Sequence, residues 1–488
     1  MPSIETRPHP YKHRALHATR AFKPSQIIHT FHPLILHPTA SHLTSVCTHC
    51  LRPGSVRACS RCHAAYYCNT ACQQAAWKAV HSKECRALQQ RKLGSRTGAD
   101  LPAPVRALVQ TLLKKEVEDA VAALDGHVLE KREAKGWRDL EMMAMAACAF
   151  AGRQTEGDFH TAVELLCKIQ TNAFHRWDVD LGQVGIFLEP TLAMANHSCV
   201  PNAVVQFVGR KAVLRAEREV QAGDEIELSY TGTFVSANSA VDVSGVSHAA
   251  VTVTDKTVQD TAAKYTAEPA HLPDSLPARY AALKAQYHAS RNLIDANLWA
   301  VSPVPQLLTE TSIYFAEQGN FPYALALVAL VATSCDPYRY AAPFHPVRVK
   351  NIFMMAKLLA NTAENTGNTL AAATARGGLG QRLQEVLSDM DQVSLCQMLL
   401  ILIVKMCPGE LADWELCLSA RDMLADIEML SGREKELSLI DGWAANGEAE
   451  TSKVFFEYAV VKQVNILAGM GREAVRIVLM SRSEVLNR

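Results

Sequence analysis

The feature that most constrains this chain is a run of closely spaced cysteines near its N-terminus. Seven of its 14 cysteines lie between residues 47 and 85, and together with one histidine they form four pairs. Two pairs are separated by two residues and two by three, so the members of a pair can reach one ion or lie one helical turn apart. The eight residues are Cys47, Cys50, Cys59, Cys62, Cys68, Cys72, His81 and Cys85. Eight ligands predict two tetrahedral zinc sites.

The same spacing predicts that these sites are structural. Protein side chains fill every position, which leaves none open for water, so the ions should stabilise the fold without catalysing a reaction. A segment of about 40 residues also has too small a core to fold without metal. A disulfide framework is the alternative, but a histidine among the ligands and the absence of a secretory leader favour zinc. Spacing alone does not decide which residues share an ion.

A second group of motifs lies in the middle of the chain. Residues 192–202 read LAMANHSCVPN, and residues 209–230 read GRKAVLRAEREVQAGDEIELSY. Alternating β-branched and aromatic residues predict short strands over 203–208, 212–216 and 225–230, with a turn at 222–224. Each part has an ordinary explanation when taken alone. Asn196 and His197 could form a buried turn, and Tyr230 could be a core aromatic of a strand.

The cysteine-rich segment resembles the MYND zinc finger through CTHC, CSRC, YYCNTAC and WKAVHSKEC, which cover residues 47–85. This resemblance implies cross-braced sites, one formed by Cys47, Cys50, Cys68 and Cys72 and the other by Cys59, Cys62, His81 and Cys85. Gln73 and Trp77 are four apart on the helix expected from Ala71 onward, so both should project from one face. The family uses that face to bind proline-rich peptides. The alternative is that Trp77 packs on the finger's own small core.

The segments on either side of the finger resemble the two halves of a SET domain. Asn196-His197-Ser198-Cys199-x-Pro201-Asn202, followed by Gly223-Asp224-Glu225-x4-Tyr230, resembles the C-terminal half. Lys12-His13-Arg14-Ala15-Leu16 resembles the opening Lys-Gly-Arg-Gly-Leu segment, and residues 170–174 (QTNAF) and 184–190 (VGIFLEP) resemble two further family segments. In its whole order, the chain resembles the SET and MYND domain family of protein lysine methyltransferases.

That resemblance implies an enzyme that transfers a methyl group from S-adenosylmethionine to a lysine of a histone or non-histone protein. The cofactor would be held by Arg14, Leu16, Asn172, Asn196 and His197. The catalytic residue would be Tyr230, whose hydroxyl can orient the lysine nitrogen. The implied cofactors are S-adenosylmethionine and two structural zinc ions. The implied partners are a protein substrate and, through Gln73 and Trp77, proline-rich peptides.

The chain departs from the family pattern in two places. His13 and Ala15 replace the two glycines of the opening segment, where glycine allows close approach to a ligand and unusual torsion angles. No cysteine occurs between Cys199 and Cys335, so the family's third zinc segment after the tyrosine strand is missing. These departures leave a second function open, in which a catalytically weak or inactive SET scaffold serves as a zinc-finger adaptor between proteins.

The expected fold class is α+β, with a split β-rich SET domain, an inserted MYND finger and a helical, tetratricopeptide-like C-terminal domain. The expected divisions are the N-terminal SET part at 1–46, the finger at 47–85, a helical insertion at 86–183, the SET core at 184–235, a linker at 236–275 and the helical domain at 276–488. Helical periodicity is found at 105–123, 139–150, 277–293, 306–318, 323–334 and 346–360.

Charge and hydropathy restrict the partners and the location. The net charge is zero, yet residues 6–83 contain ten Lys and Arg and no Asp or Glu. This basic segment could favour acidic groups, or it could simply be a solvated face. Direct nucleic-acid binding is not expected, because the basic residues do not cluster on one recognition helix. The apolar runs are shorter than the roughly 20 residues of a membrane span, and no secretory segment opens the chain. We therefore expect a cytoplasmic or nuclear protein without a membrane partner.

Overall fold

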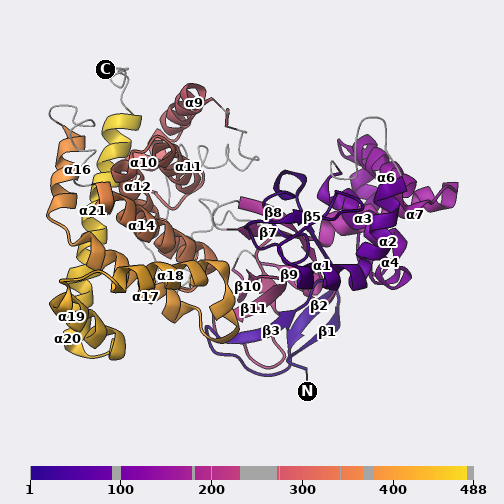
Figure 1. Ribbon diagram of the computed structural model, residues 1–488, viewed down its shortest axis with the longest axis horizontal. Coiled ribbons are helices and arrows are strands. Elements are labelled where there is room, and N and C mark those ends of the chain that lie inside the picture. Colours follow the sequence, from indigo (N-terminus) through magenta and orange to yellow (C-terminus); the bar gives the residue numbers. More distant parts are fainter. Residues whose placement is uncertain are drawn as a thin grey trace. The chain divides into compact units, whose positions relative to one another are not determined.

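The computed structural model describes residues 2–90, 101–178, 182–198, 200–230, 272–273, 275–340, 342–365 and 378–480. The chain divides into two compact units, one of residues 1–228 with 413–415 and one of residues 229–412 with 416–488. The first unit contains strands and helices, whereas the elements described in the second are helical (Figure 1). The expected α+β class is therefore confirmed. The expected linker, 236–275, lies outside the described residues except for 272, 273 and 275.

Two three-stranded sheets join the segments that precede and follow the finger. In one sheet, β11 (Lys211–Ala216) lies between β3 (Ile27–Phe31) and β10 (Ala203–Val208), and all pairs are antiparallel. In the other, β8 (Gly182–Leu188) lies between β4 (Ile35–Pro38) and β7 (Phe174–Asp178). Strands from both sides of the finger thus share sheets, which is the split organisation expected from the sequence.

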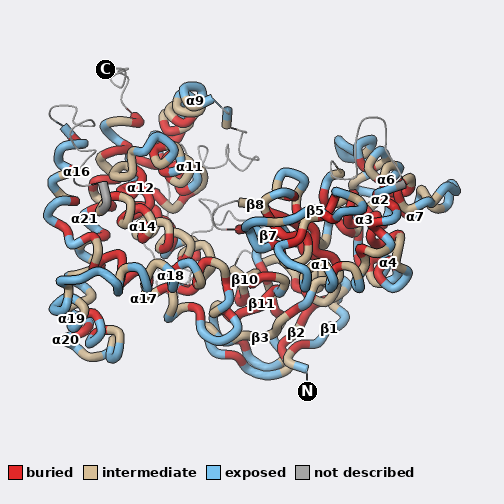
Figure 2. Tube along the Cα trace, in the orientation of Figure 1, coloured by how far each residue is buried: buried red, intermediate tan, exposed pale blue. Residues whose placement is uncertain are grey.

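The inward faces of these strands form a common core. Phe31, Leu36, Phe187 and Leu214 are buried in one hydrophobic cluster, and Figure 2 shows buried residues along the same strands. At Gly185 on β8, an added Cβ would lie 2.5 Å from the carbonyl oxygen of His37. Only glycine therefore allows β8 to approach β4 this closely.

A separate hairpin at the N-terminus contains the first departure from the family pattern. Strands β1 (Ile4–His9) and β2 (His13–Ala18) pair antiparallel, with His9 opposite His13. His13 has a φ of 61°, and the Arg14 N–H donates to the Lys12 carbonyl at 2.7 Å. A hydrogen bond of this span around a left-handed residue is a γ-turn, which is rare for residues that carry a Cβ. The histidine thus adopts a backbone conformation that glycine adopts without steric cost.

The finger is built from short elements. After the 3₁₀ turn η1 (Ala40–His42) come β5 (Arg57–Ala58), β6 (Tyr66–Tyr67), α1 (Thr70–Ala76), the π-helical turn η2 (Trp77–His81) and α2 (Ser82–Gln90). The Asn69 side chain caps α1 by accepting a hydrogen bond from the Cys72 N–H at 2.8 Å. The small core of the finger contains Ala65, Tyr67 and the buried zinc-ligand cysteines. Such a core agrees with a segment that depends on metal for its stability.

Five helices follow the finger and form a second core. They are α3 (Ala103–Leu113), α4 (Lys115–Ala122), α5 (Val128–Glu133), α6 (Trp137–Ala151) and α7 (Glu156–Asn172). The expected continuous helix 105–123 is wrong, because Lys114 is extended and separates α3 from α4. The expected helical insertion up to 183 also ends too late. Residues 174–178 form β7, which pairs with β8.

The second unit contains helices from α9 onward. They are α9 (Leu276–Ala289), α10 (Arg291–Asp295), α11 (Val304–Glu317), α12 (Phe321–Ser334), α13 (Asp336–Arg339), α14 (Pro346–Asn365), α16 (Leu379–Ser388), α17 (Gln392–Met406), η6 (Gly409–Asp413), α18 (Glu415–Glu428), α19 (Glu434–Ala445), α20 (Glu450–Phe456), η7 (Glu457–Val461), α21 (Lys462–Ala474) and η8 (Val475–Leu479). The helix expected at 277–293 is divided between α9 and α10. The tetratricopeptide-like repeat stays a prediction.

The helical unit has one feature relevant to membranes. Within the described ranges, no single helix has the length and apolar character needed to cross a bilayer, but α16 and α17, bent by 77° at their junction, pass that test as a pair.

Candidate functional site

The eight predicted zinc ligands gather into two groups of four. Cys47, Cys50, Cys68 and Cys72 form the tetracysteine site, and Cys59, Cys62, His81 and Cys85 form the histidine site. Within each site all ligand atoms lie within 4.8 Å of one another. For example, Cys50 Sγ is 3.9 Å from Cys68 Sγ, and Cys62 Sγ is 3.7 Å from His81 Nε2. Tetrahedral zinc with Zn–S bonds of about 2.3 Å requires sulfur separations of about 3.8 Å. Both groups therefore fit zinc, and they are the two sets that the MYND resemblance implies.

The two sites differ in their exposure. Cys68 of the tetracysteine site is exposed, and Cys50 and Cys72 are half-buried. In the histidine site, His81 and Cys85 are buried, because η2 and α2 carry them one helical turn apart against the rest of the unit. Solvent therefore reaches the tetracysteine site more readily.

A buried carboxylate supports the histidine site from outside the ligand set. Glu84 Oε2 lies 2.9 Å from His81 Nδ1, and Glu84 Oε1 accepts from Arg106 Nε at 3.0 Å and Nη2 at 2.8 Å. Burial alone would raise the pKa of Glu84, but the Arg106 charge and the His81 hydrogen bond hold that pKa well below its usual range. An ionised Glu84 can thus fix the ring of His81 with Nε2 directed at the metal.

The proposed peptide-binding pair lies on the helix that follows Cys68. Gln73 belongs to α1 and Trp77 begins η2, and both side chains are half-buried. The guanidinium of Arg61 lies 5.4 Å from the Trp77 ring centroid, and the ring meets His81 edge-on at 6.0 Å. Trp77 therefore packs partly against the finger and keeps part of its surface open. Its role in peptide binding stays a prediction.

Asn196 connects two segments that are distant in the sequence. Strand β9 (Asn196–His197) pairs in parallel with β12 (Glu227–Leu228). The Asn196 side-chain amide donates to the Arg14 carbonyl at 3.0 Å and to Glu225 Oε1 at 2.8 Å. These bonds use the amide N–H groups and leave Oδ1 to act as an acceptor. A fixed acceptor of this kind fits the ammonium group of the methionine part of S-adenosylmethionine.

Arg14 and Asn172 meet at the loop between α4 and α5. Arg14 Nη2 donates to the Ala123 carbonyl at 2.9 Å and lies 3.6 Å from Asp125 Oδ2. The Asn172 amide donates to the Asp125 carbonyl at 2.7 Å. At Gly126 an added Cβ would lie 2.9 Å from Lys168 Cγ, so glycine allows this loop to pack on α7. The structure thus brings Arg14, Asn172 and Asn196 into one chain of contacts.

Leu16, His197 and Tyr230 are the other residues predicted for cofactor binding and catalysis. Leu16 is fully buried in the core, and its carbonyl accepts from the Ile226 N–H at 2.7 Å. His197 lies opposite Leu228 in the parallel pair. Tyr230 follows β12 by two residues, is 60% exposed and is assigned to the second unit. The cofactor roles of Leu16 and His197 and the catalytic role of Tyr230 stay predictions.

Sequence reasoning missed the contacts that several polar residues make around these sites. Glu225 accepts from Asn196 and, at 3.0 Å, from Lys12 Nζ, so it ties the N-terminal hairpin to β9. Burial would raise its pKa, but these two hydrogen bonds lower it, so the carboxylate is ionised at neutral pH. Glu84 follows His81 by three residues on a helix, and this spacing could have predicted their contact. No local signal pointed to Arg106.

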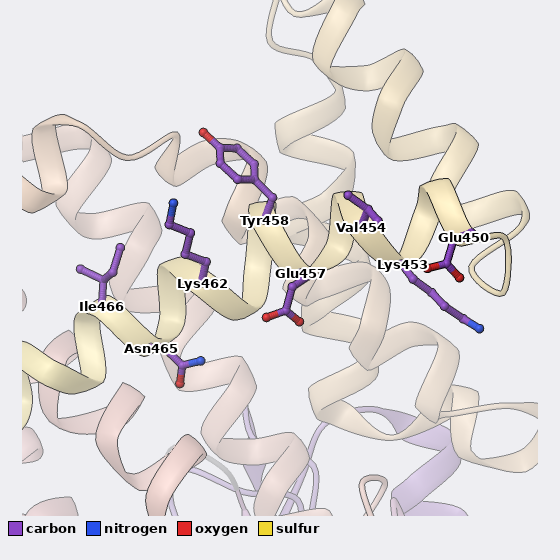
Figure 3. Close-up of a pocket in the computed structure, with 8 residues that line it drawn as sticks. All are labelled: Glu450, Lys453, Val454, Glu457, Tyr458, Lys462, Asn465 and Ile466. Carbon is purple, nitrogen blue, oxygen red and sulfur yellow. The ribbon is translucent and has the colours of Figure 1, made fainter.

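Two concave regions accompany these sites. A cavity of about 270 Å³ in the first unit is lined by finger residues such as Tyr67 and Val80, by Gln110 and Lys114, and by Arg210. A surface groove of about 830 Å³ runs along α20, η7 and α21 in the helical unit. The elements α20, η7 and α21 follow one another as a continuous helix. In Figure 3, Tyr458 and Ile466 project from one side of this helix and Asn465 from the other. The groove contains none of the predicted site residues.

Comparisons with known proteins agree with the assignment of the finger. The profile of the MYND finger matches residues 47–85. Histone-lysine N-methyltransferase ASHR1 of Arabidopsis thaliana is 29% identical over 237 residues, which are 46% of this chain and 48% of that protein. N-lysine methyltransferase SMYD2-A of Xenopus laevis is 31% identical over 236 residues, which are 45% and 53% of the two chains. Histone-lysine N-methyltransferase SMYD3 of Mus musculus is 27% identical over 225 residues, covering 44% and 52%.

The chain is a MYND zinc-finger protein in which the finger interrupts a β-rich domain. Over a little less than half of its length it is similar to lysine methyltransferases of the SET and MYND domain family. The matches span about half the length of these curated relatives. Among solved structures, the SET domain of LSMT bound to lysine and AdoHcy aligns with this chain at 12% identity, with coverage of 94% of each chain and a TM-score of 0.22.

Proposed function

We propose that this chain transfers a methyl group from S-adenosylmethionine to a lysine of a histone or non-histone protein. The observation that carries the proposal is the position of Asn196, whose amide joins the Arg14 backbone to Glu225 next to the β9–β12 pair. Three segments far apart in the sequence meet there, in the order typical of the family. The names of the lysine methyltransferase relatives support the same reaction.

The residues of this chain have distinct tasks in that reaction. S-adenosylmethionine supplies the electrophilic methyl group. The Oδ1 atoms of Asn196 and Asn172 act as acceptors for its polar end, because their amide N–H groups already bind backbone and carboxylate oxygens. The hydroxyl of Tyr230 orients the lysine nitrogen for in-line attack, and its ring helps to exclude water, which favours the neutral amine.

The finger supports a second proposed role in protein binding. Gln73 and Trp77 offer a half-buried face beside Arg61, which suits a proline-rich peptide. The left-handed His13 in the opening segment favours the alternative function, a weak or inactive SET scaffold that serves as a zinc-finger adaptor. Thiolate zinc sites persist where thiols stay reduced, so we also propose a cytoplasmic or nuclear location. Nucleic acid and membranes are not among the proposed partners.

The test is a comparison of cofactor affinity and methylation rate in the zinc-loaded chain. Asn196→Ala should weaken binding of S-adenosylmethionine in calorimetric titration, because it removes a positioned acceptor. Tyr230→Phe should bind the cofactor almost normally but transfer methyl about 100-fold more slowly, because the hydroxyl acts in the transition state. Tyr11→Phe, on the exposed turn of the hairpin, is the matched control and should leave both quantities unchanged.

Two results would contradict the proposal in different ways. Wild-type protein that fails to bind S-adenosylmethionine at millimolar concentration would favour the adaptor function. Binding without methyl transfer to any protein substrate would place the defect after cofactor binding, near Tyr230 and the missing cysteine segment.

A further inference from the structure

Each zinc site of the finger has an arginine partner from outside the finger. At the histidine site the partner is Arg106 of α3, which is 0% exposed. It reaches the ligand His81 through Glu84, which is 1% exposed, and it also donates to the Ala64 carbonyl of the finger at 2.8 Å. Gln110, one turn further along α3, donates to the same oxygen of Glu84 at 3.1 Å. Helix α3 therefore holds both the finger backbone and the carboxylate that orients a zinc ligand.

The partner at the tetracysteine site comes from a different element. Arg210 lies in the two-residue turn between β10 and β11, and its Nη1 donates to the His49 carbonyl at 2.8 Å. His49 lies between the ligands Cys47 and Cys50. Four thiolates around Zn²⁺ carry a formal charge of −2, and a site of three thiolates and one neutral histidine carries −1. Arg210 offsets part of this charge beside the tetracysteine site, whereas at the histidine site the charge of Arg106 is paired with that of Glu84.

We infer that the two zinc ions attach the finger to two different parts of the surrounding domain, the histidine site to α3 through Glu84 and Arg106 and the tetracysteine site to the β10–β11 turn through Arg210. The finger is then not an independent module. Zinc at the histidine site fixes the contact with α3, and zinc at the tetracysteine site fixes the contact with the β10–β11 turn. Glu84 with Arg106, and Arg210, in turn stabilise zinc at their own sites. Removal of such an outer partner of a metal ligand lowers metal affinity by about 10- to 100-fold.

The inference predicts site-specific effects on zinc release. In the full chain mixed with an excess of a chromogenic chelator, zinc should leave in two phases, the faster from the tetracysteine site because Cys68 is exposed. Cys68→Ser should abolish the fast phase and so assign it. Glu84→Gln should accelerate only the slow phase, by about 10- to 100-fold. Arg210→Met should accelerate only the fast phase.

Matched controls use charged neighbours that do not contact the ligand sets. Arg86→Met lies two residues after Glu84, and Lys211→Met lies next to Arg210; both residues are exposed. Both controls should release zinc at the wild-type rates. A general change in surface charge would affect each control as much as its partner variant.

Glu84→Gln leaves Arg106 buried without its carboxylate, so this variant can fail to fold. The double variant Glu84→Met with Arg106→Leu removes both charges and keeps apolar volume, which buried pairs often tolerate. It should remain folded and still release zinc from the histidine site faster. Wild-type release rates in this variant would overturn the inference. Equal acceleration of both phases by Glu84→Gln or Arg210→Met would also overturn it, because that result indicates general destabilisation.

Hydrogen exchange of the amides in α3 gives a second readout that does not depend on the chelator. Selective loss of zinc from the histidine site should increase exchange in α3 but leave the β10–β11 turn protected. Equal exchange in both segments would contradict the separation of the two attachments.

Discussion

Replacing His13 with glycine should stabilise the N-terminal hairpin. His13 has a φ of 61° and an exposed side chain, so the substitution removes a strained Cβ without removing a buried contact. A left-handed residue with a Cβ costs about 1–2 kcal/mol. Glycine loses about 0.5–1 kcal/mol more conformational entropy on folding than a residue with a side chain. The net gain is therefore about 0.5–1 kcal/mol in the free energy of opening the hairpin.

This gain can be measured by hydrogen exchange with mass spectrometry on the β1–β2 segment. Exchange of its paired amides should slow by about two- to fivefold in His13→Gly, since 1.4 kcal/mol corresponds to a factor of ten. His13→Ala is the control, because it removes the imidazole but keeps the Cβ, and it should give no slowing. Unchanged or faster exchange in His13→Gly, or equal slowing in His13→Ala, would refute the attribution to backbone strain.

Three further outcomes are expected. Elemental analysis should find two zinc ions per chain. A strong chelator should make segment 47–85 sensitive to protease. A segment that stays resistant to protease after metal removal would contradict a metal-dependent finger. Glu225→Gln should lower the affinity for S-adenosylmethionine about tenfold, because it loosens the Asn196 side chain. Glu227 lies 3.2 Å from Lys12 Nζ, and Glu227→Gln should have little effect on that affinity. Equal losses of affinity in calorimetry would argue against a positioning role for Glu225. Burial raises the pKa of Asp336 from 3.8 to about 6, so its stabilising contribution is complete below about pH 4 and is lost as the pH rises through 6. Asp336→Asn should therefore raise the free energy of unfolding by about 1–3 kcal/mol at pH 7.5 but not at pH 4, and equal urea midpoints for both proteins at pH 7.5 would disprove this.

The zinc ligands could be predicted because their geometry is encoded locally. Two- and three-residue gaps fix which side chains can reach one ion, and the family pattern supplied the grouping that spacing alone left open. Strand β10 and helix α12 were also predicted within a few residues, since Gly319 to Pro322 mark a break and alternation marks a strand.

The features that could not be predicted depend on contacts between distant residues. No glycine or proline marks Lys114, where α3 ends, because the break is set by packing of α3 and α4 within the unit. Strand β7 forms since β8 offers it a partner. The contacts of Asp125 with Arg14 and Asn172, and of Arg106 with Glu84, join positions that no local spacing relates.

The pairing of β3 with β11 has a consequence for synthesis of the chain. Ile27 on β3 pairs with Arg215 on β11, a separation of 188 residues. At translation rates of about 5–20 residues per second, β3 leaves the ribosome roughly 10–40 s before its partner exists. During that interval the finger can already bind zinc, while the edge of β3 stays unpaired and open to association with other chains. Until the second half of the sheet is made, this unpaired edge makes the nascent chain prone to aggregation, the hazard that chaperones counter.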